Sequence, residues 1–179
     1  MYKLQLRNGY DFGEVASALQ KAVRRGNEAD ALYWAVELDI SGYGEYLWKR
    51  LRVISSEDIG LAEPMMPATI RALYESWLEI HRKKDDGERL FVIHAVLLLV
   101  RARKSRLVDN CLVASFRNHP AGKEVPDYAL DKHTLRGKSM GRGFDHFFEV
   151  GAHLENHAQQ EGEREYGEEA KRLLDEGES

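Results

Sequence analysis

An almost unbroken apolar run at residues 90–100, LFVIHAVLLLV, restricts the fold of this chain more than any other stretch. Its eleven residues are too few to span a bilayer, which takes about 20 apolar residues in a helix. A helix that is apolar on nearly every face must be covered by protein, so we expect this segment to lie at the centre of a bundle. A lone histidine on such a helix is normally a neutral core residue, and we predict this for His94.

Helical periodicity extends over most of the remaining chain, and alternating polar and apolar runs are scarce. Asn27 followed by Asp30 is typical of a helix N-cap. Pro64 and Pro67 suit the first turn of another helix. We therefore predict an all-α fold of six to eight helices, with a turn at KKDDGER and helices near residues 11–25, 28–40, 45–55, 64–83, 89–103 and 105–118.

Charge is distributed unevenly along the chain. Residues 161–179 contain eight acids and three bases, a net charge of −5, which leaves +1 for residues 1–160. We expect residues 1–160 to form one compact domain, and residues 161–179 to be an acidic tail that is either a frayed helix or disordered. The lone Cys111 and an N-terminus without a signal-peptide core favour a cytoplasmic protein with no membrane segment.

The segment 118–143 is the least regular part of the sequence, with two prolines and four glycines. Long irregular connections tend to be functional. GKS at residues 137–139 is not a nucleotide-binding loop, because that pattern needs a glycine where Lys132 stands; we predict no cofactor. The alternatives for this segment are a solvated loop folded over the core and an anion site, with a nucleic-acid backbone bound by Lys132, Arg136, Lys138 and Arg142.

Residues 144–158 carry several histidines. At 100° per residue the apolar side chains fall on one side of a helix and the histidines on the other. A polar stripe of this kind is normally solvated or faces a subunit, and we expect no bound metal. The alternative is a metal or acid–base centre, because histidines at i and i+4 can share a metal; its ligands would come from Asp131, His133, His146, Glu149, His153 and His157.

Two adjacent carboxylates, Glu57 and Asp58, lie where a helix is expected to end, in the stretch SSEDIG. The partial negative charge of a helix C-terminus disfavours them there. We interpret the motif Ser56, Glu57, Asp58 and Gly60 as an architectural corner. One carboxylate would accept hydrogen bonds from the start of the next helix, Gly60 would supply a permissive backbone, and the other carboxylate would pair with Arg50, Arg52, Arg101 or Arg103.

The most distinctive wording lies in residues 31–64, and specifically in Ala31, Leu32, Tyr33, Trp34, Arg50, Leu51, Ser56, Glu57, Asp58, Ile59, Gly60, Leu61, Ala62 and Pro64. This block resembles the helical domain that follows the ATPase module in the MgsA/RarA family of replication-associated AAA+ proteins. These are related to clamp loaders and to the Werner helicase-interacting protein. VRRGNEADA, Lys104–Ser105 and Val125–Pro126 fit more loosely, so that the similarity covers about residues 15–145.

The resemblance implies an oligomerisation or collar-like domain without catalysis, acting in DNA replication or repair. Its partners would be further copies in a dimer or tetramer, DNA, and a separate AAA+ ATPase or replication protein. The chain lacks the family's ATPase module, and its start and acidic finish favour a free-standing relative over a fragment. The competing classes are a small metal-dependent enzyme using residues 131–157 and a DNA-binding module using residues 132–142.

Overall fold

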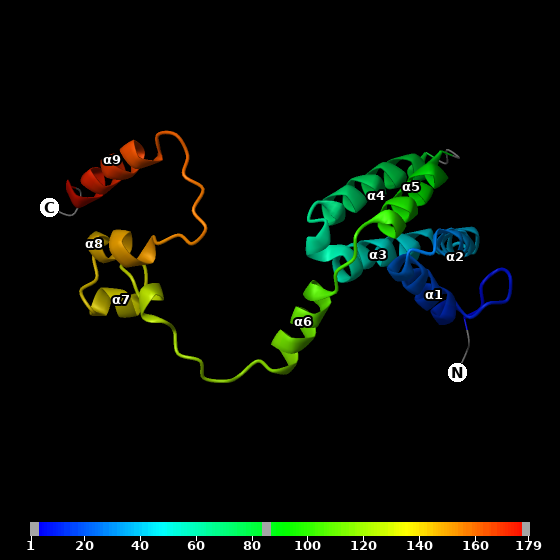
Figure 1. The fold of residues 1–179 in the computed structure, drawn as a ribbon, viewed down its shortest axis with the longest axis horizontal. Coiled ribbons are helices and arrows are strands. Elements are labelled where there is room, and N and C mark those ends of the chain that lie inside the picture. The colour runs from blue at the N-terminus through cyan, green and yellow to red at the C-terminus, as the bar shows by residue number, and fades with distance from the viewer. Residues whose placement is uncertain (1–3, 84–86, 177–179) are drawn as a thin grey trace. The chain divides into compact units, whose positions relative to one another are not determined.

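A computed structural model describes residues 4–83 and 87–176 of the chain (Figure 1). Its contacts divide the chain into two compact units, Met1–His119 and Pro120–Ser179, which are described separately. In the described ranges the regular elements are all helical, apart from an isolated antiparallel bridge between Gln5 and Asp11. The all-α prediction is confirmed. No helix within these ranges is long and apolar enough to cross a membrane.

Five helices form the bundle of the first unit: α1 (Phe12–Arg25), α2 (Glu28–Ile40), α3 (Gly44–Ile54), α4 (Met66–Arg82) and α5 (Glu88–Arg101). The Asn27 side chain caps α2 by accepting a hydrogen bond from the Asp30 amide, as predicted. Gly26 has a φ of 71°, which lets α1 turn directly into α2. The expected turn at residues 83–89 lies partly outside the described residues.

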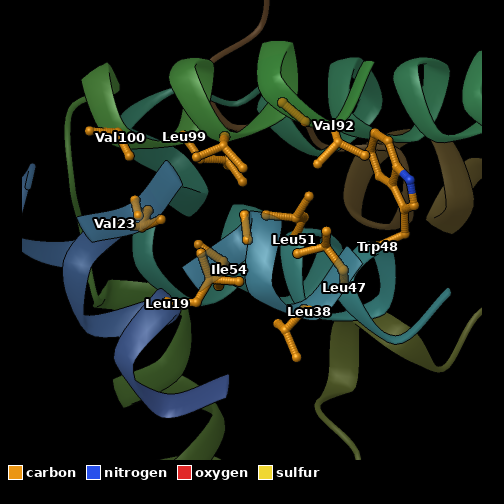
Figure 2. Close-up of a cluster of buried hydrophobic side chains, with 14 of the residues drawn as sticks. Leu19, Val23, Leu38, Leu47, Trp48, Leu51, Ile54, Val92, Leu99 and Val100 are labelled. Carbon is orange, nitrogen blue, oxygen red and sulfur yellow. The ribbon is translucent and has the colours of Figure 1, made fainter. Parts of the chain in front are cut away.

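The core of the first unit is built from the inner sides of all five helices, α1 to α5 (Figure 2). Trp48 on α3 and Trp77 on α4 are fully buried beside one another, with ring centroids 5.9 Å apart. Aromatic pairs at this spacing add to the stabilisation from burial. Figure 2 labels the side chains that meet between these helices: Leu19, Val23, Leu38, Leu47, Trp48, Leu51, Ile54, Val92, Leu99 and Val100.

The apolar helix α5 is covered less completely than its sequence predicts. Val92, Val96 and Leu99 are buried against α1, α2, α3 and α4. His94 is exposed, and so is Leu90 at 69%. The prediction of a buried neutral His94 is therefore wrong, because neighbouring helices cover α5 on one side and leave the opposite face open.

After α3 the chain makes two short elements, the π-helix η1 (Ser55–Ile59) and the 3-10 helix η2 (Gly60–Ala62). The chain then passes through α4 and α5 to α6 (Leu107–Arg117), which packs against η1 and η2. No residue of α6 is buried. Figure 1 shows α6 directed away from the five-helix bundle of its own unit.

The second unit contains short elements followed by one longer helix. These are η3 (Asp127–Ala129), α7 (Leu135–Ser139), α8 (Phe144–His146), the π-helix η4 (Phe147–Gly151) and α9 (Glu163–Glu176). Among the described residues of the second unit, Leu130 is the one apolar side chain that is buried. Residues 163–176 of the acidic segment form the helix α9, and the chain divides by contacts after His119. The prediction of a separate tail that begins at residue 161 is based on charge alone, and it stays a prediction.

Candidate functional site

The corner SSEDIG has a backbone that the sequence did not predict. In η1 the Gly60 amide donates to the carbonyl of Ser55, a π-helical bond, where an ordinary helix end was expected. π-helical turns are rare in proteins, and many of those that occur lie at functional sites. Gly60 itself has a φ of 47°, so it supplies the permissive backbone conformation expected of it. A Cβ there would lie 2.9 Å from Val108 Cγ2, so α6 approaches the corner closely.

Asp58 lies at the centre of a buried hydrogen-bond network and is 0% exposed. Its Oδ2 accepts from Gln20 Nε2 at 2.8 Å, and its Oδ1 accepts from Arg24 Nε at 2.5 Å. Arg106 Nη1 approaches Oδ1 from the other side at 3.5 Å. The Asp58 carbonyl accepts from the Ser105 amide at 2.9 Å. Asp58 therefore ties α1 to the segment that leads into α6.

Glu57 completes the network at its solvent edge. Its Oε1 accepts from Arg24 Nη2 at 3.1 Å and lies 3.4 Å from Arg106 Nη1. The hydrogen bond to Asp58 raises the pKa of Arg24. Arg106 also bonds the Asp109 carboxylate on α6. Because the two arginines sit between three carboxylates, charges that would be costly if buried alone are compensated.

The arginines predicted to pair with this corner are engaged elsewhere, so that part of the interpretation is wrong. Arg50 bonds Gln20, and the Arg52 guanidinium lies over the Tyr74 ring. Arg101 pairs with Glu28 on α2, and Arg103 bonds Glu63 and the Ala62 carbonyl. The start of α4 has no side-chain cap, so neither carboxylate of the corner serves there.

Two of the true partners of Asp58 have a signal in the sequence that the prediction overlooked. Gln20 and Arg24 are four residues apart on α1, which puts both side chains on one helix face. That spacing within an otherwise apolar stripe indicates a polar partner in the core. Arg106 carries no comparable signal, because it lies 48 residues from Asp58 and only the tertiary fold brings them together.

A hollow of about 450 Å³ lies between α3 and α6 beside this corner. Val53, Val108 and Leu112 form its apolar part. Its α3 side also carries Lys49 and Arg52, and its other side carries Glu57 and Asp109. Ser56 is exposed at its edge. The corner motif thus borders an apolar concavity with polar margins of opposite charge.

The four bases predicted to meet an anion differ in their surroundings. Arg142 is only 15% exposed and holds its own unit together, donating to the Asp127 carboxylate at 2.5 Å and to the Leu130 carbonyl at 2.6 Å. The hydrogen bond from Arg142 lowers the pKa of Asp127. The Lys132 ammonium lies over the Phe144 ring. Arg136 and Lys138 are exposed on α7.

The GKS tripeptide is part of a tightly packed turn. Thr134 caps α7 by accepting a hydrogen bond from the Gly137 amide at 3.0 Å, and its hydroxyl donates to the Asp131 carbonyl. A Cβ on Gly137 would lie 1.8 Å from that same carbonyl oxygen. Gly137 therefore has a packing role.

The predicted histidine stripe is wrong, because the helical period does not continue past η4. His153 and His157 lie in irregular chain, where their ring nitrogens approach Glu155 and Glu163 respectively. His133 makes an edge-to-face contact with Phe147. Within residues 4–83 and 87–176, no group of three or more His, Cys, Asp or Glu side chains could hold a metal ion. The predicted ligands Asp131, His146 and Glu149 therefore do not form such a group.

Residues 26–172 match the family described as MgsA AAA+ ATPase C terminal. The chain belongs to this family. The match contains the SSEDIG corner, α6 and most of α9; it begins later than the expected region of about residues 15–145 and extends beyond it on the C-terminal side.

Several curated relatives carry the name replication-associated recombination protein A. The chain is 31% identical to the Bacillus subtilis protein over 136 residues, covering 74% of this chain and 31% of the relative. It is 30% identical to the Haemophilus influenzae protein over 171 residues, covering 92% and 36%. The Escherichia coli K12 protein is 30% identical over 161 residues, covering 87% and 34%. The chain thus spans about a third of the length of the curated relatives it matches.

Proposed function

We propose that this chain is a non-catalytic assembly domain that forms a dimer or tetramer and acts with an AAA+ ATPase in DNA replication or repair. Membership of the MgsA C-terminal family carries this proposal. It agrees with the large apolar side chains that a single copy leaves exposed, including Tyr33 on α2, Leu90 on α5 and Phe116 on α6. Closed homo-oligomers are the common outcome for such surfaces. If the chain acts with replication proteins, we expect it to be located in the cytoplasm.

The molar mass of the full chain in solution tests this proposal. Light scattering after size exclusion should give two or four times the mass of 20.5 kDa at micromolar concentration, and the mass should fall on dilution. A mass of one chain over the whole concentration range would contradict self-association. A pull-down with a purified AAA+ ATPase of this family would then test the second partner.

A second candidate activity is contact with a nucleic-acid backbone through the second unit. Arg136 and Lys138 are exposed on α7, and Lys132 lies in the turn before that helix. Phosphate contacts come mainly from such basic side chains. Arg142 is excluded from this role because it donates to Asp127 and to backbone carbonyls within its own unit.

Binding of labelled single- and double-stranded DNA, measured at several salt concentrations, tests the DNA interaction. The double variant Arg136→Glu, Lys138→Glu should weaken binding and reduce the salt slope by about one for each phosphate interaction that it removes. The matched control is Lys123→Glu, an exposed base of the same unit outside α7. Equal weakening by the control would mean that only bulk charge matters, and no binding at low salt would end the proposal.

A further inference from the structure

We propose that α6 and the hollow beside it form the self-association surface, and that a second copy of the same surface occupies it through a two-fold axis. The inference rests on the self-association proposed above and adds the residues that carry it. It concerns the first unit alone.

The first observation is that α6 is an uncovered apolar helix. It has eleven residues, and none of them is buried. Leu112 is 54% exposed and Phe116 is 81% exposed, and Leu107 and Val113 are about half exposed. A helix of this length is marginal in water by itself, and most helical stability in proteins comes from packing an apolar face. A surface of this kind normally marks a contact with another protein.

The second observation is that α6 is held in a defined position. Arg106 at its start bonds Asp109 and lies between Glu57 and Asp58. The Ser105 amide donates to the Asp58 carbonyl, and Val108 packs onto the backbone of Gly60. The helix is therefore presented by a buried polar network, so its apolar side chains have a fixed direction. Such preorganisation lowers the entropic cost of association.

The third observation is that one surface carries both a ridge and a hollow. Phe116 is the most exposed apolar side chain of α6, one turn after Leu112, while Leu112 lines the concavity of about 450 Å³ between α3 and α6 together with Val53 and Val108. A two-fold axis makes each contact twice, so the ridge of each copy can enter the hollow of the other. This self-complementarity points to a second copy as the occupant.

Charge at the margins of the hollow fits the same occupant. Lys49 and Arg52 stand on its α3 side, and Glu57 and Asp109 stand on the side of η1 and α6, where three carboxylates face two guanidinium groups and leave one net negative charge. A two-fold axis that runs along the hollow, between its two margins, places the basic margin of one copy against the acidic margin of the other. Complementary margins of this kind guide and orient association.

The face formed by α2 and α5 is the alternative surface within the first unit. It exposes Val36 and Leu90 and contains a smaller hollow of about 180 Å³ lined partly by Val36 and Ile93. Both α2 and α5 bury their opposite sides in the core, so their exposed apolar residues belong to helices that are already covered. α6 has no such cover, and the α2–α5 face provides the matched control.

The experiment compares full-length variants by light scattering as a function of concentration. Leu112→Glu with Phe116→Glu should raise the dissociation constant of the oligomer by about 100-fold or more, as expected when two central apolar residues are lost. Val36→Glu with Leu90→Glu should leave it within a few fold of the parent. Far-UV circular dichroism shows that each variant is folded.

The exposed Cys111 on α6, the single cysteine of the chain, gives a second readout without any mutation. If copies cover α6, its reaction with a thiol reagent should slow as protein concentration rises through the association range. Association with unchanged Cys111 reactivity, or dissociation by the control variant instead, would overturn this surface and leave self-association standing. A parent chain that stays monomeric would overturn both proposals.

Discussion

At the scale of single residues, Asp58 and Glu57 are neighbours in the sequence with different surroundings. Asp58 is fully buried and bonded to Gln20 and Arg24, whereas Glu57 is partly open to solvent. The sequence correctly indicated that these carboxylates need compensation at the end of a helix. It could not name Arg106 as a partner, because a separation of 48 residues leaves no local pattern.

This difference predicts unequal effects of two alanine substitutions. Asp58→Ala should lower the free energy of unfolding by about 3 kcal/mol, since it leaves the Nε2 donor of Gln20 and the Nε donor of Arg24 without an acceptor in a buried site. Glu57→Ala should cost about 1 kcal/mol or less, because its ion pairs are solvated. Urea unfolding of both variants measures the two values. Equal decreases in the free energy of unfolding would show that Glu57 stabilises the network as much as Asp58 does.

Gly137 leads to a second prediction about a single residue. Gly137→Ala should destabilise the second unit, because a Cβ would collide with the Asp131 carbonyl and the turn would have to open. Amide hydrogen exchange should then quicken in residues 127–151 and stay unchanged in the first unit. Gly122→Ala is a control for a glycine with open space around it, although its φ of 79° adds some strain. Unchanged exchange in Gly137→Ala would refute the packing role.

At the scale of elements, the periodic pattern predicted the five bundle helices. It did not predict the two π-helices, η1 and η4. Periodicity and the Asn27 cap are local signals, so they located α1 to α5 to within a few residues. A π-turn depends on the surroundings of the chain, and η4 ended the helix on which the His153–His157 pair was predicted. The exposure of His94 was missed for a related reason, since hydropathy does not tell which side of α5 its neighbours cover.

The ion pair between Asp127 on η3 and Arg142, in the loop before α8, predicts a dependence on pH. Arg142 lowers the pKa of the Asp127 carboxyl group in the folded state. The ion pair therefore stabilises the second unit above the ordinary carboxyl pKa of about 4, and this stabilisation disappears as pH falls through the lower folded value. Amide chemical shifts of residues 127–142 between pH 2 and 6 should report the change. In Asp127→Asn the same region should show no such step, and a step that persists would assign it to another group.

At the scale of the whole molecule, the sequence predicted helices throughout, and the family match agrees with the resemblance seen in residues 31–64. The division into two compact units was not predicted. Charge marked the acidic segment, but contacts place the division after His119, in the irregular stretch for which a solvated loop and an anion site were the alternatives. Prolines, glycines and charged residues indicate where regular structure ends, but they do not indicate which segments pack against one another.

The placement of the aromatic core gives the two units different optical signatures. All three tryptophans, Trp34, Trp48 and Trp77, belong to the first unit, and the last two are buried. Their emission should be shifted to the blue and should follow the melting of the first unit alone, while far-UV circular dichroism follows both. A substitution in the second unit such as Gly137→Ala should therefore alter the dichroism melt and leave the fluorescence melt where it was. Tryptophan fluorescence therefore reports on the first unit, residues 1–119, and not on the second.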